Sequence, residues 1–456
     1  PVFQPPWRPR SHVSHVTMNR LPKMQMAPMI AHVAGANALP DEVLEQIIER
    51  TDGVPLFVEE LTKMVIETGL VRGGVDGYVV DDPLAPLAIP TTLHDSLTAR
   101  LDHLAPVKEV AQLGATIGRE FGFELLAAVS PMADNELRDA LDELVEAELV
   151  FPRGVGPGAT FVFKHALIRD TAYQSLIRSV RQQYHRRIAT ALEEHFPEIA
   201  GAQPEVVAHH YAEAGLTTRA VDYWAEAGDR ARERSAMAEA QAHFERGIAL
   251  LEAVSEGHER DDMELRLMMG LGATLMATLG YTDPRVADSC ERARELAIAL
   301  DRPQALGTVM LGSAVAAMLR GDLLEAHEYG VELLAISARA QEDMIVAAAH
   351  FVLGMATANF GRLAEASEHL DQCLDYLDRN PSDSMHFAYG QHPTVIALTY
   401  RAMVSSYLGR LDHGARAQEQ AVQYARALDH PFTSAVHLGI SVELALLLRE
   451  PAYVQE

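Results

Sequence analysis

The lysines of this sequence show whether it contains a phosphate-binding loop, because a P-loop places a lysine between a glycine and a serine or threonine. The lysine ammonium reaches the terminal phosphates of a nucleotide, and the hydroxyl that follows holds magnesium. Only four of the 38 basic residues are lysines, namely Lys23, Lys63, Lys108 and Lys164. None of them follows a glycine. These 456 residues therefore contain no standard phosphate-binding loop of this kind.

Other residue types that do chemistry lack the partners they need. His209-His210 and Glu213 offer a His/Glu pair four residues apart, but no third metal ligand accompanies them, so we interpret them as repeat-surface residues. Cys290 and Cys373 lie 83 residues apart, which excludes a disulfide framework or thiolate zinc cluster and predicts a cytoplasmic protein. No Ser/His/Asp or Cys/His arrangement has a recognisable context. We assign no catalytic residue and no metal site.

The charge balance bears on the class of partner. Acidic residues outnumber basic ones by 64 to 38, a formal charge of −26, which disfavours nucleic acid and anionic membrane as partners. The densest basic cluster is Arg178, Arg181, His185, Arg186 and Arg187. If this cluster lies on a winged-helix domain, it indicates DNA binding. The alternative is a solvated helix face beside acidic repeats, and we prefer this second interpretation. No apolar run approaches the ~20 residues that cross a bilayer.

The elements that must position these residues are mainly helices. Apolar spacing predicts helices near 22–33, 40–52, 56–68, 91–104, 106–117, 122–129 and 134–147. Residues 71–88 read as an exposed loop, because they are rich in Gly, Asp and Pro. Two β-like runs, 149–151 and 160–163, flank the Gly-rich stretch 154–158, which we interpret as a flexible wing. Helices followed by a hairpin are typical of a winged-helix domain. A long helix follows over 165–196, with a break near Ser179.

The second half of the sequence repeats itself. Gly280, Gly321, Gly361 and Gly409 recur at spacings of 41, 40 and 48 residues, each where one helix would turn into the next. An earlier copy is indicated at Gly215, followed by a helix over 238–251. The unit Gly-x-hydrophobic-x-x-Ala matches the helix–turn–helix of tetratricopeptide repeats, although these periods exceed the usual ~34 residues. The sequence therefore predicts an α-solenoid from about residue 201 to the end.

Three segments together resemble one protein family. They are Arg-Thr-Asp-Gly-Val-Pro-Leu-Phe-Val-Glu-Glu-Leu at 50–61, Ile-Pro-Thr-Thr-Leu at 89–93 and Phe-Lys-His-Ala-Leu-Ile-Arg-Asp-Thr-Ala-Tyr at 163–173. They resemble the bacterial STAND-type (AAA-related) signalling ATPases that often follow a class III adenylate/guanylate cyclase domain and end in tetratricopeptide repeats. The resemblance covers nearly the whole chain and begins late in the ATPase core, at residues 3–7 and 17–21. It implies that the P-loop and Walker B strand lie upstream. Since the chain begins with Pro1, we expect a fragment.

The resemblance implies three nucleotide-site residues. Gly53-Val54-Pro55 matches the family's Gly-x-Pro lid motif, whose proline packs against adenine; the alternative is a helix junction with a glycine at the C-cap. His165 matches the winged-helix histidine that senses the nucleotide phosphates; the alternative is a hydrogen-bonded histidine between a strand and a helix. The implied cofactor is ATP or ADP, with magnesium in the longer protein.

These expectations combine into one architecture. The fold is mainly α: residues 1–85 form the end of the ATPase core and a helical lid, 86–200 a winged-helix domain with a short hairpin, and 201–456 a tetratricopeptide-like solenoid. We expect the regulatory part of an ATP-dependent switch, controlling a cyclase in the longer protein, with repeats that bind a protein, a peptide or a small effector. A nucleotide-dependent oligomer is also expected. This chain alone should not hydrolyse ATP. The alternatives are a non-catalytic interaction scaffold and part of a STAND-type transcriptional regulator.

Overall fold

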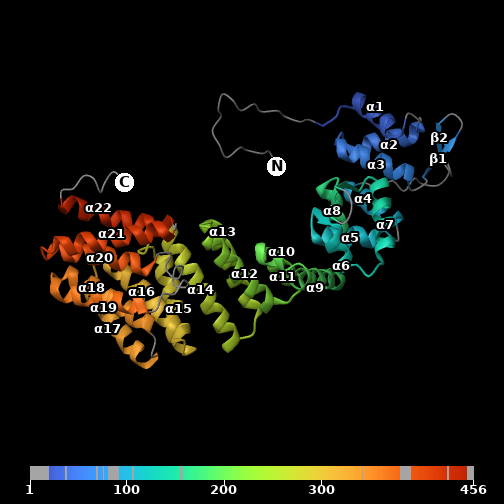
Figure 1. Ribbon diagram of the computed structural model, residues 1–456. Coiled ribbons are helices and arrows are strands. Elements are labelled where there is room, and N and C mark those ends of the chain that lie inside the picture. The colour runs from blue at the N-terminus through green and yellow to red at the C-terminus, as the bar shows by residue number, and fades with distance from the viewer. Residues whose placement is uncertain are drawn as a thin grey trace. The chain divides into compact units, whose positions relative to one another are not determined.

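A computed structural model describes most of the chain. The described residues are 20–35, 39–67, 70–74, 77–80, 92–104, 107–154, 158–340, 343–379, 392–428 and 431–448. The chain divides into two compact units, Pro1–Ala191 and Leu192–Glu456, and the boundary falls within helix α9 (Arg178–His195). Figure 1 shows helices throughout both units and short strands in the first. The expected mainly α fold is confirmed, whereas the division into three domains stays a prediction.

Three helices open the first unit: α1 (Lys23–Val33), α2 (Asp41–Thr51) and α3 (Pro55–Glu67). Asp41 and Glu42 stand in the first turn of α2. Their carboxylates stabilise the helix there, because they interact favourably with the unpaired backbone N–H groups and with the positive end of the helix dipole. The predicted apolar face of α2 is confirmed, because Val43 and Ile47 are fully buried against α1 and α3.

The predicted loop over 71–88 is wrong in its first part, which forms a hairpin. Strands β1 (Val71–Gly74) and β2 (Gly77–Val80) pair antiparallel, with Val71 opposite Val80 and Gly73 opposite Tyr78. Valine and tyrosine favour the extended backbone, and the side chain of Val71 is buried against α3. These two contributions outweigh the low strand propensity of the neighbouring glycines. Residues 81–91, including the start of the Ile-Pro-Thr-Thr segment, lie outside the described residues.

The rest of the first unit is a region of helices and one small sheet, here called the helix–sheet region (residues 92–174). Its elements are α4 (Leu93–His103), α5 (Lys108–Ile117), β3 (Glu120–Gly122), α6 (Phe123–Val129), α7 (Asp134–Glu146), β4 (Val150–Arg153), β5 (Thr160–Phe163) and α8 (Ala166–Gln174). The predicted hairpin is present, with Val150 opposite Phe163, and β3 adds a third antiparallel strand on the other side of β5. The predicted break in the following helix separates α8 from α9. Residues 155–157 of the predicted wing lie outside the described residues. The winged-helix assignment stays a prediction.

The second unit is a series of helices in which each packs on the next. They are α10 (Pro197–Ala202), α11 (Pro204–Glu213), α12 (Thr217–Glu233), α13 (Met237–Leu250), α14 (His258–Leu279), α15 (Pro284–Ala299), α16 (Pro303–Arg320), α17 (Leu323–Ala340), α18 (Asp343–Asn359), α19 (Leu363–Arg379), α20 (Pro393–Tyr407), α21 (Leu411–Leu428) and α22 (Pro431–Leu448). Helices α16, α18 and α20 also contact one another in turn, as stacked repeats require. This is a tetratricopeptide-like solenoid, a scaffold class that proteins use to bind partners.

The turn glycines of the repeats lie where the sequence predicted them. Gly280, Gly321, Gly361 and Gly409 have φ between +74° and +87° and join α14 to α15, α16 to α17, α18 to α19 and α20 to α21. Ser235 also has a positive φ, +59°, between α12 and α13, so the turn within the predicted earlier copy forms without a glycine.

A buried small residue follows four of these five turns at a fixed distance, the exception being the turn at Gly280. Ala240, Ala326 and Ala366 stand five positions after Ser235, Gly321 and Gly361, and all three are fully buried. Gly414 takes this position after Gly409, and a Cβ there would lie 2.5 Å from the Ser406 hydroxyl. Small side chains at this position therefore let paired helices approach closely.

Candidate functional site

The Gly53-Val54-Pro55 motif connects α2 to α3 through a close backbone contact. Gly53 has φ +72°, and a Cβ on it would overlap the Leu21 carbonyl oxygen. The Leu21 N–H donates to the Gly53 carbonyl at 2.7 Å, which fixes this approach. Pro55 is the first residue of α3 and is exposed, at a position where a missing N–H costs no helical hydrogen bond. These contacts explain both residues as a helix junction, and the adenine contact stays a prediction.

His165 is the residue immediately before α8 and follows β5. Its backbone is extended, and its side chain makes no capping hydrogen bond. The imidazole Nε2 is buried and has no hydrogen-bond partner among the described residues. A buried nitrogen left in this state costs about 1–3 kcal/mol, part of which a ligand that bonds to it would recover. The structure therefore leaves His165 with an unused hydrogen-bonding group, and its role toward nucleotide stays a prediction.

A ring of alternating charges links α3 to the residues before His165. Lys164 Nζ lies 2.7 Å from Glu59 Oε1 and 2.8 Å from Glu148 Oε2. Lys63 Nζ also contacts both carboxylates, at 3.0 Å from Glu59 Oε1. We call these four residues the lysine–glutamate ring. It contains two of the four lysines in the chain, and both are about 15% exposed.

The ring changes the proton affinity of Glu59, Glu148 and Lys164. Hydrogen bonds from Lys164 and Lys63 lower the pKa of Glu148 to about 2. Burial alone would raise the pKa of Glu59 and lower that of Lys164, but the hydrogen bonds within the ring outweigh burial in both cases. The pKa of Glu59 is therefore lowered and that of Lys164 is raised. All three groups hold their charges more firmly than they would in water.

A second cluster centres on Arg100 of α4, whose side chain is 1% exposed. Its guanidinium donates to both carboxylate oxygens of Glu67, at 2.7 and 2.9 Å, and to the Ala147 carbonyl at 2.8 Å. It also pairs with Glu60, which is completely buried. Glu60 and Glu67 belong to α3, and Ala147 follows α7. The Arg100 cluster and the lysine–glutamate ring together fasten α3 to the helix–sheet region.

The two predicted nucleotide motifs meet through the ring. Glu59 stands four residues after Pro55 on α3, and Lys164 immediately precedes His165. The Glu59–Lys164 contact joins residues 105 positions apart in the chain. Sequence reasoning missed this junction, although Glu59-Glu60, Lys63 and Glu67 at spacings of three and four already indicated a charged face on α3. The sequence could not show which partners would meet that face.

The basic cluster on α9 is only partly a solvated face. Arg178 and Arg186 are exposed as expected. His185 is buried instead, with its Nε2 2.9 Å from the Tyr173 hydroxyl. Arg181 stacks on the Tyr173 ring, 4.6 Å from its centre, and donates to the Leu176 carbonyl. The cluster therefore helps to pack α8 against α9. Among the described residues, no three potential ligands gather as a metal site, around His209 or elsewhere.

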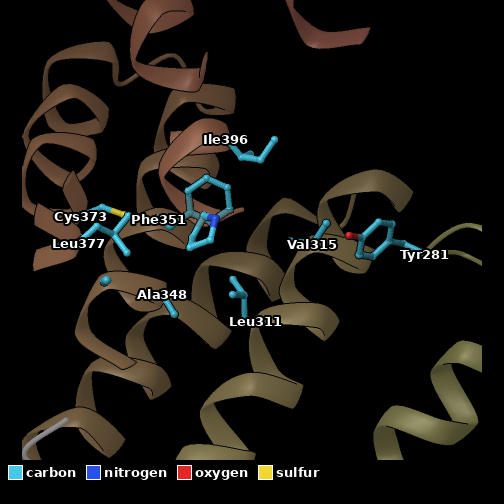
Figure 2. Close-up of a pocket in the computed structure, with 10 residues that line it drawn as sticks. Tyr281, Leu311, Val315, Ala348, Phe351, Cys373, Leu377 and Ile396 are labelled. Carbon is cyan, nitrogen blue, oxygen red and sulfur yellow. The ribbon is translucent and has the colours of Figure 1, made fainter. Parts of the chain in front are cut away.

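An apolar hollow lies within the repeats, and the sequence analysis did not predict it. Figure 2 shows side chains from α16, α18, α19 and α20, with Tyr281, converging on one space. Its lining residues are Tyr281, Leu311, Val315, Ala347, Ala348, Phe351, Cys373, Leu377, Pro393 and Ile396. Burial raises the pKa of both Cys373 and Tyr281 to about 12, so both stay neutral. We call this space the apolar hollow.

Comparison with known sequences identifies one relative but no family. No protein-family model matches the chain. An uncharacterized protein of Rhizobium meliloti (strain 1021) is 26% identical over 405 residues, which cover 87% of this chain and 38% of that protein. The chain therefore spans little more than a third of the length of this curated relative. None of the described helices is long and apolar enough to cross a membrane.

Solved structures share the helical repeat character at low similarity. Aspartyl phosphate phosphatase F from Bacillus subtilis is similar over 97% of this chain and 93% of its own, with 12% identity and a TM-score of 0.41. A signal transduction ATPase with numerous domains (STAND) and a tetratricopeptide repeat sensor, from Pyrococcus horikoshii, is similar over 96% and 71%, with 11% identity and a TM-score of 0.35. Because both scores lie below 0.5, the repeat assignment rests on the helix pairs and turns of this chain.

Proposed function

We propose that this chain is the regulatory region of an ATP-dependent STAND-type signalling protein. In this proposal, α1–α3 act as a nucleotide lid, the helix–sheet region acts as a winged-helix domain, and the repeats bind a protein or peptide. The observation that carries the proposal is the Glu59–Lys164 contact, which connects the helix starting at Pro55 to the residue before His165. A ligand that touches either motif would act on the same packed junction.

In this proposal the junction acts as a two-state element. Moving α3 away from the helix–sheet region breaks the ring and exposes the Arg100 cluster, so intermediate positions are unfavourable. A nucleotide shifts such an equilibrium only if it binds one state more tightly than the other. His165 Nε2, which has no hydrogen-bond partner in the part of the chain that the structure describes, is the group that would gain a bond in only one arrangement. ATP and ADP, held mainly by residues outside this chain, are the proposed ligands.

The output of the switch belongs to the longer protein. There we propose control of an adenylate/guanylate cyclase, as the family resemblance implies, with the repeats supplying the input. A second candidate, a non-catalytic interaction scaffold, is favoured by one observation: local packing alone accounts for Gly53 and Pro55. Nucleotide binding separates the two candidates.

The test is calorimetric titration of ATP and ADP into the protein encoded by the complete natural reading frame. Pro55→Ala and His165→Ala should each weaken ADP binding at least about tenfold, which corresponds to about 1.4 kcal/mol. Pro284→Ala is the matched control for Pro55, because Pro284 is also an exposed first residue of a helix. His413→Ala replaces an exposed histidine on α21 and controls for His165. Unchanged binding in both test variants would favour the scaffold.

A further inference from the structure

We infer that the apolar hollow takes one aliphatic side chain from a positively charged segment of the partner protein. This inference rests on the proposed function only in assuming that the repeats bind a protein or peptide. It assigns the place of contact and the chemistry of the partner, neither of which the repeat architecture specifies by itself.

The size and lining of the hollow select the anchor. Its volume is about 40 Å³. One water needs roughly 10–15 Å³ and a small-molecule site has roughly 300–1,000 Å³, so the hollow suits a few carbon atoms. Leu311, Val315 and Phe351 line it and are only partly buried, so they are open to a visiting group. The lining offers mostly carbon, with a neutral thiol and the Tyr281 hydroxyl as its polar side-chain groups, which favours an aliphatic side chain.

The charge of the repeats selects the surroundings of that anchor. Residues 192–456 contain 40 acidic residues, 20 arginines and no lysine, a formal charge of −20. Ion pairs with carboxylates already occupy at least twelve of these arginines, among them Arg292, Arg302 and Arg401. The excess charge on this surface is therefore carboxylate.

The same charge decides between occupants. Helix α19 provides Cys373 and Leu377 to the lining and also carries the exposed residues Asp375 and Asp378. An acidic segment would be repelled by this unit, and a second copy of the chain would bring a further net charge of −26. A cationic segment is attracted from a distance by the negative charge of this unit, and this attraction grows as it approaches. Its apolar side chain then fills the hollow. The partner is thus a basic segment with an aliphatic anchor.

Three fluorescein-labelled 12-residue peptides test this inference by fluorescence anisotropy with the whole 456-residue chain. The first carries six arginines and a central leucine, the second replaces the leucine with serine, and the third replaces the arginines with glutamates. The leucine–arginine peptide should bind at least about tenfold tighter than the serine version, the factor expected from burying one leucine. The glutamate peptide should not bind, and added salt should weaken both arginine peptides.

Matched variants locate the binding. Ala348→Leu fills the hollow and should abolish the preference for leucine, whereas Ala335→Leu places the same change on an exposed site of α17 and should preserve it. If Ala348→Leu does not fold, Val315→Ser with Val331→Ser as control answers the same question, because Val331 is exposed and outside the hollow.

The failures are distinguishable. Equal binding of the two arginine peptides, or a preference that survives Ala348→Leu, overturns the inference and leaves partner binding by the repeats intact. Tight binding of the glutamate peptide overturns the assignment of charge. No binding of any peptide at about 1 mM overturns the inference, while the nucleotide half of the proposed function is judged by its own titration, since this assay contains no nucleotide.

Discussion

Arg100→Met tests whether the charged junction holds α3 on the helix–sheet region. The substitution keeps much of the side-chain length and removes every polar contact of the guanidinium. Arg100 is 1% exposed and pairs with Glu60, which is 0% exposed, and with Glu67, which is 36% exposed. In the variant Glu67 can still reach water. Glu60 remains buried without its counter-charge.

The expected size of the effect follows from this burial. Removing one partner of a buried ion pair costs about 3–5 kcal/mol, most of it from the charge left behind. Arg302→Met is the control, because Arg302 and Asp262 form a pair in which each side chain is 50% exposed. Such a surface pair contributes about 0–1 kcal/mol. Adding Glu60→Gln to Arg100→Met should recover about 1–3 kcal/mol, because the buried charge is gone.

Hydrogen exchange with mass spectrometry measures the opening of this junction without requiring two-state unfolding of the whole chain. Peptides that cover 55–67 and 93–103 should exchange roughly 100- to 5,000-fold faster in Arg100→Met, since each 1.4 kcal/mol is a factor of ten. Peptides from α16–α20 should keep their rates. If Arg100→Met exchanges no faster than Arg302→Met, the buried pair does not hold the junction and the reasoning is wrong.

Three further outcomes are expected. The pKa of Glu148 is about 2 when folded and 4.5 when unperturbed, so the first unit should lose stability as the pH falls from about 4.5 toward 2; Glu148→Gln should reduce this loss in urea unfolding at each pH. His350 and His369 approach Nδ1 to Nδ1 at 3.0 Å, and burial lowers the pKa of both. The second unit should therefore lose stability below about pH 6.5, where unfolded histidine takes up protons, and thermal melts at pH 7.5 and 5.5 would show no difference if this is wrong. Gly53→Ala should lower the unfolding free energy more than Gly154→Ala. Both glycines have positive φ, so an alanine at either position costs about 1–2 kcal/mol, but only the Cβ at position 53 would overlap other atoms. Equal losses of unfolding free energy would contradict the close approach of Gly53 to Leu21.

The sequence predicted best those elements that local chemistry determines. The apolar face of α2 and the turn glycines depend on residues a few positions apart, and each lies where the spacing placed it. Ser235 shows the limit of this method, because a serine in a left-handed turn carries no compositional signal. The β1–β2 hairpin was missed because Val71 gains its stability from burial against α3, which a local window does not contain.

The site was predictable only as separate pieces. Gly53, Pro55 and His165 were named from motif resemblance, but nothing local linked Glu59 to Lys164 across 105 positions. Long-range ion pairs depend on which helix faces meet, and charged residues at helical spacing fit a solvated face equally well. The apolar hollow was invisible for a similar reason. Its lining comes from four helices and from Tyr281 between two others, and each part contributes residues that are ordinary for a repeat core.

The lysine–glutamate ring also allows opening of the first unit to be measured by chemical labelling of its amines. An amine must lose its proton before an acylating reagent can attack it, and in the ring Lys63 and Lys164 are shielded and bonded to carboxylates. Acylation of either amine would leave two carboxylates facing a single ammonium, so each modified molecule would be held open. Because residues 192–456 contain no lysine, side-chain amine labelling is confined to the first unit. The rate at which Lys63 and Lys164 are labelled therefore reports the fraction of time that α3 is detached from the helix–sheet region.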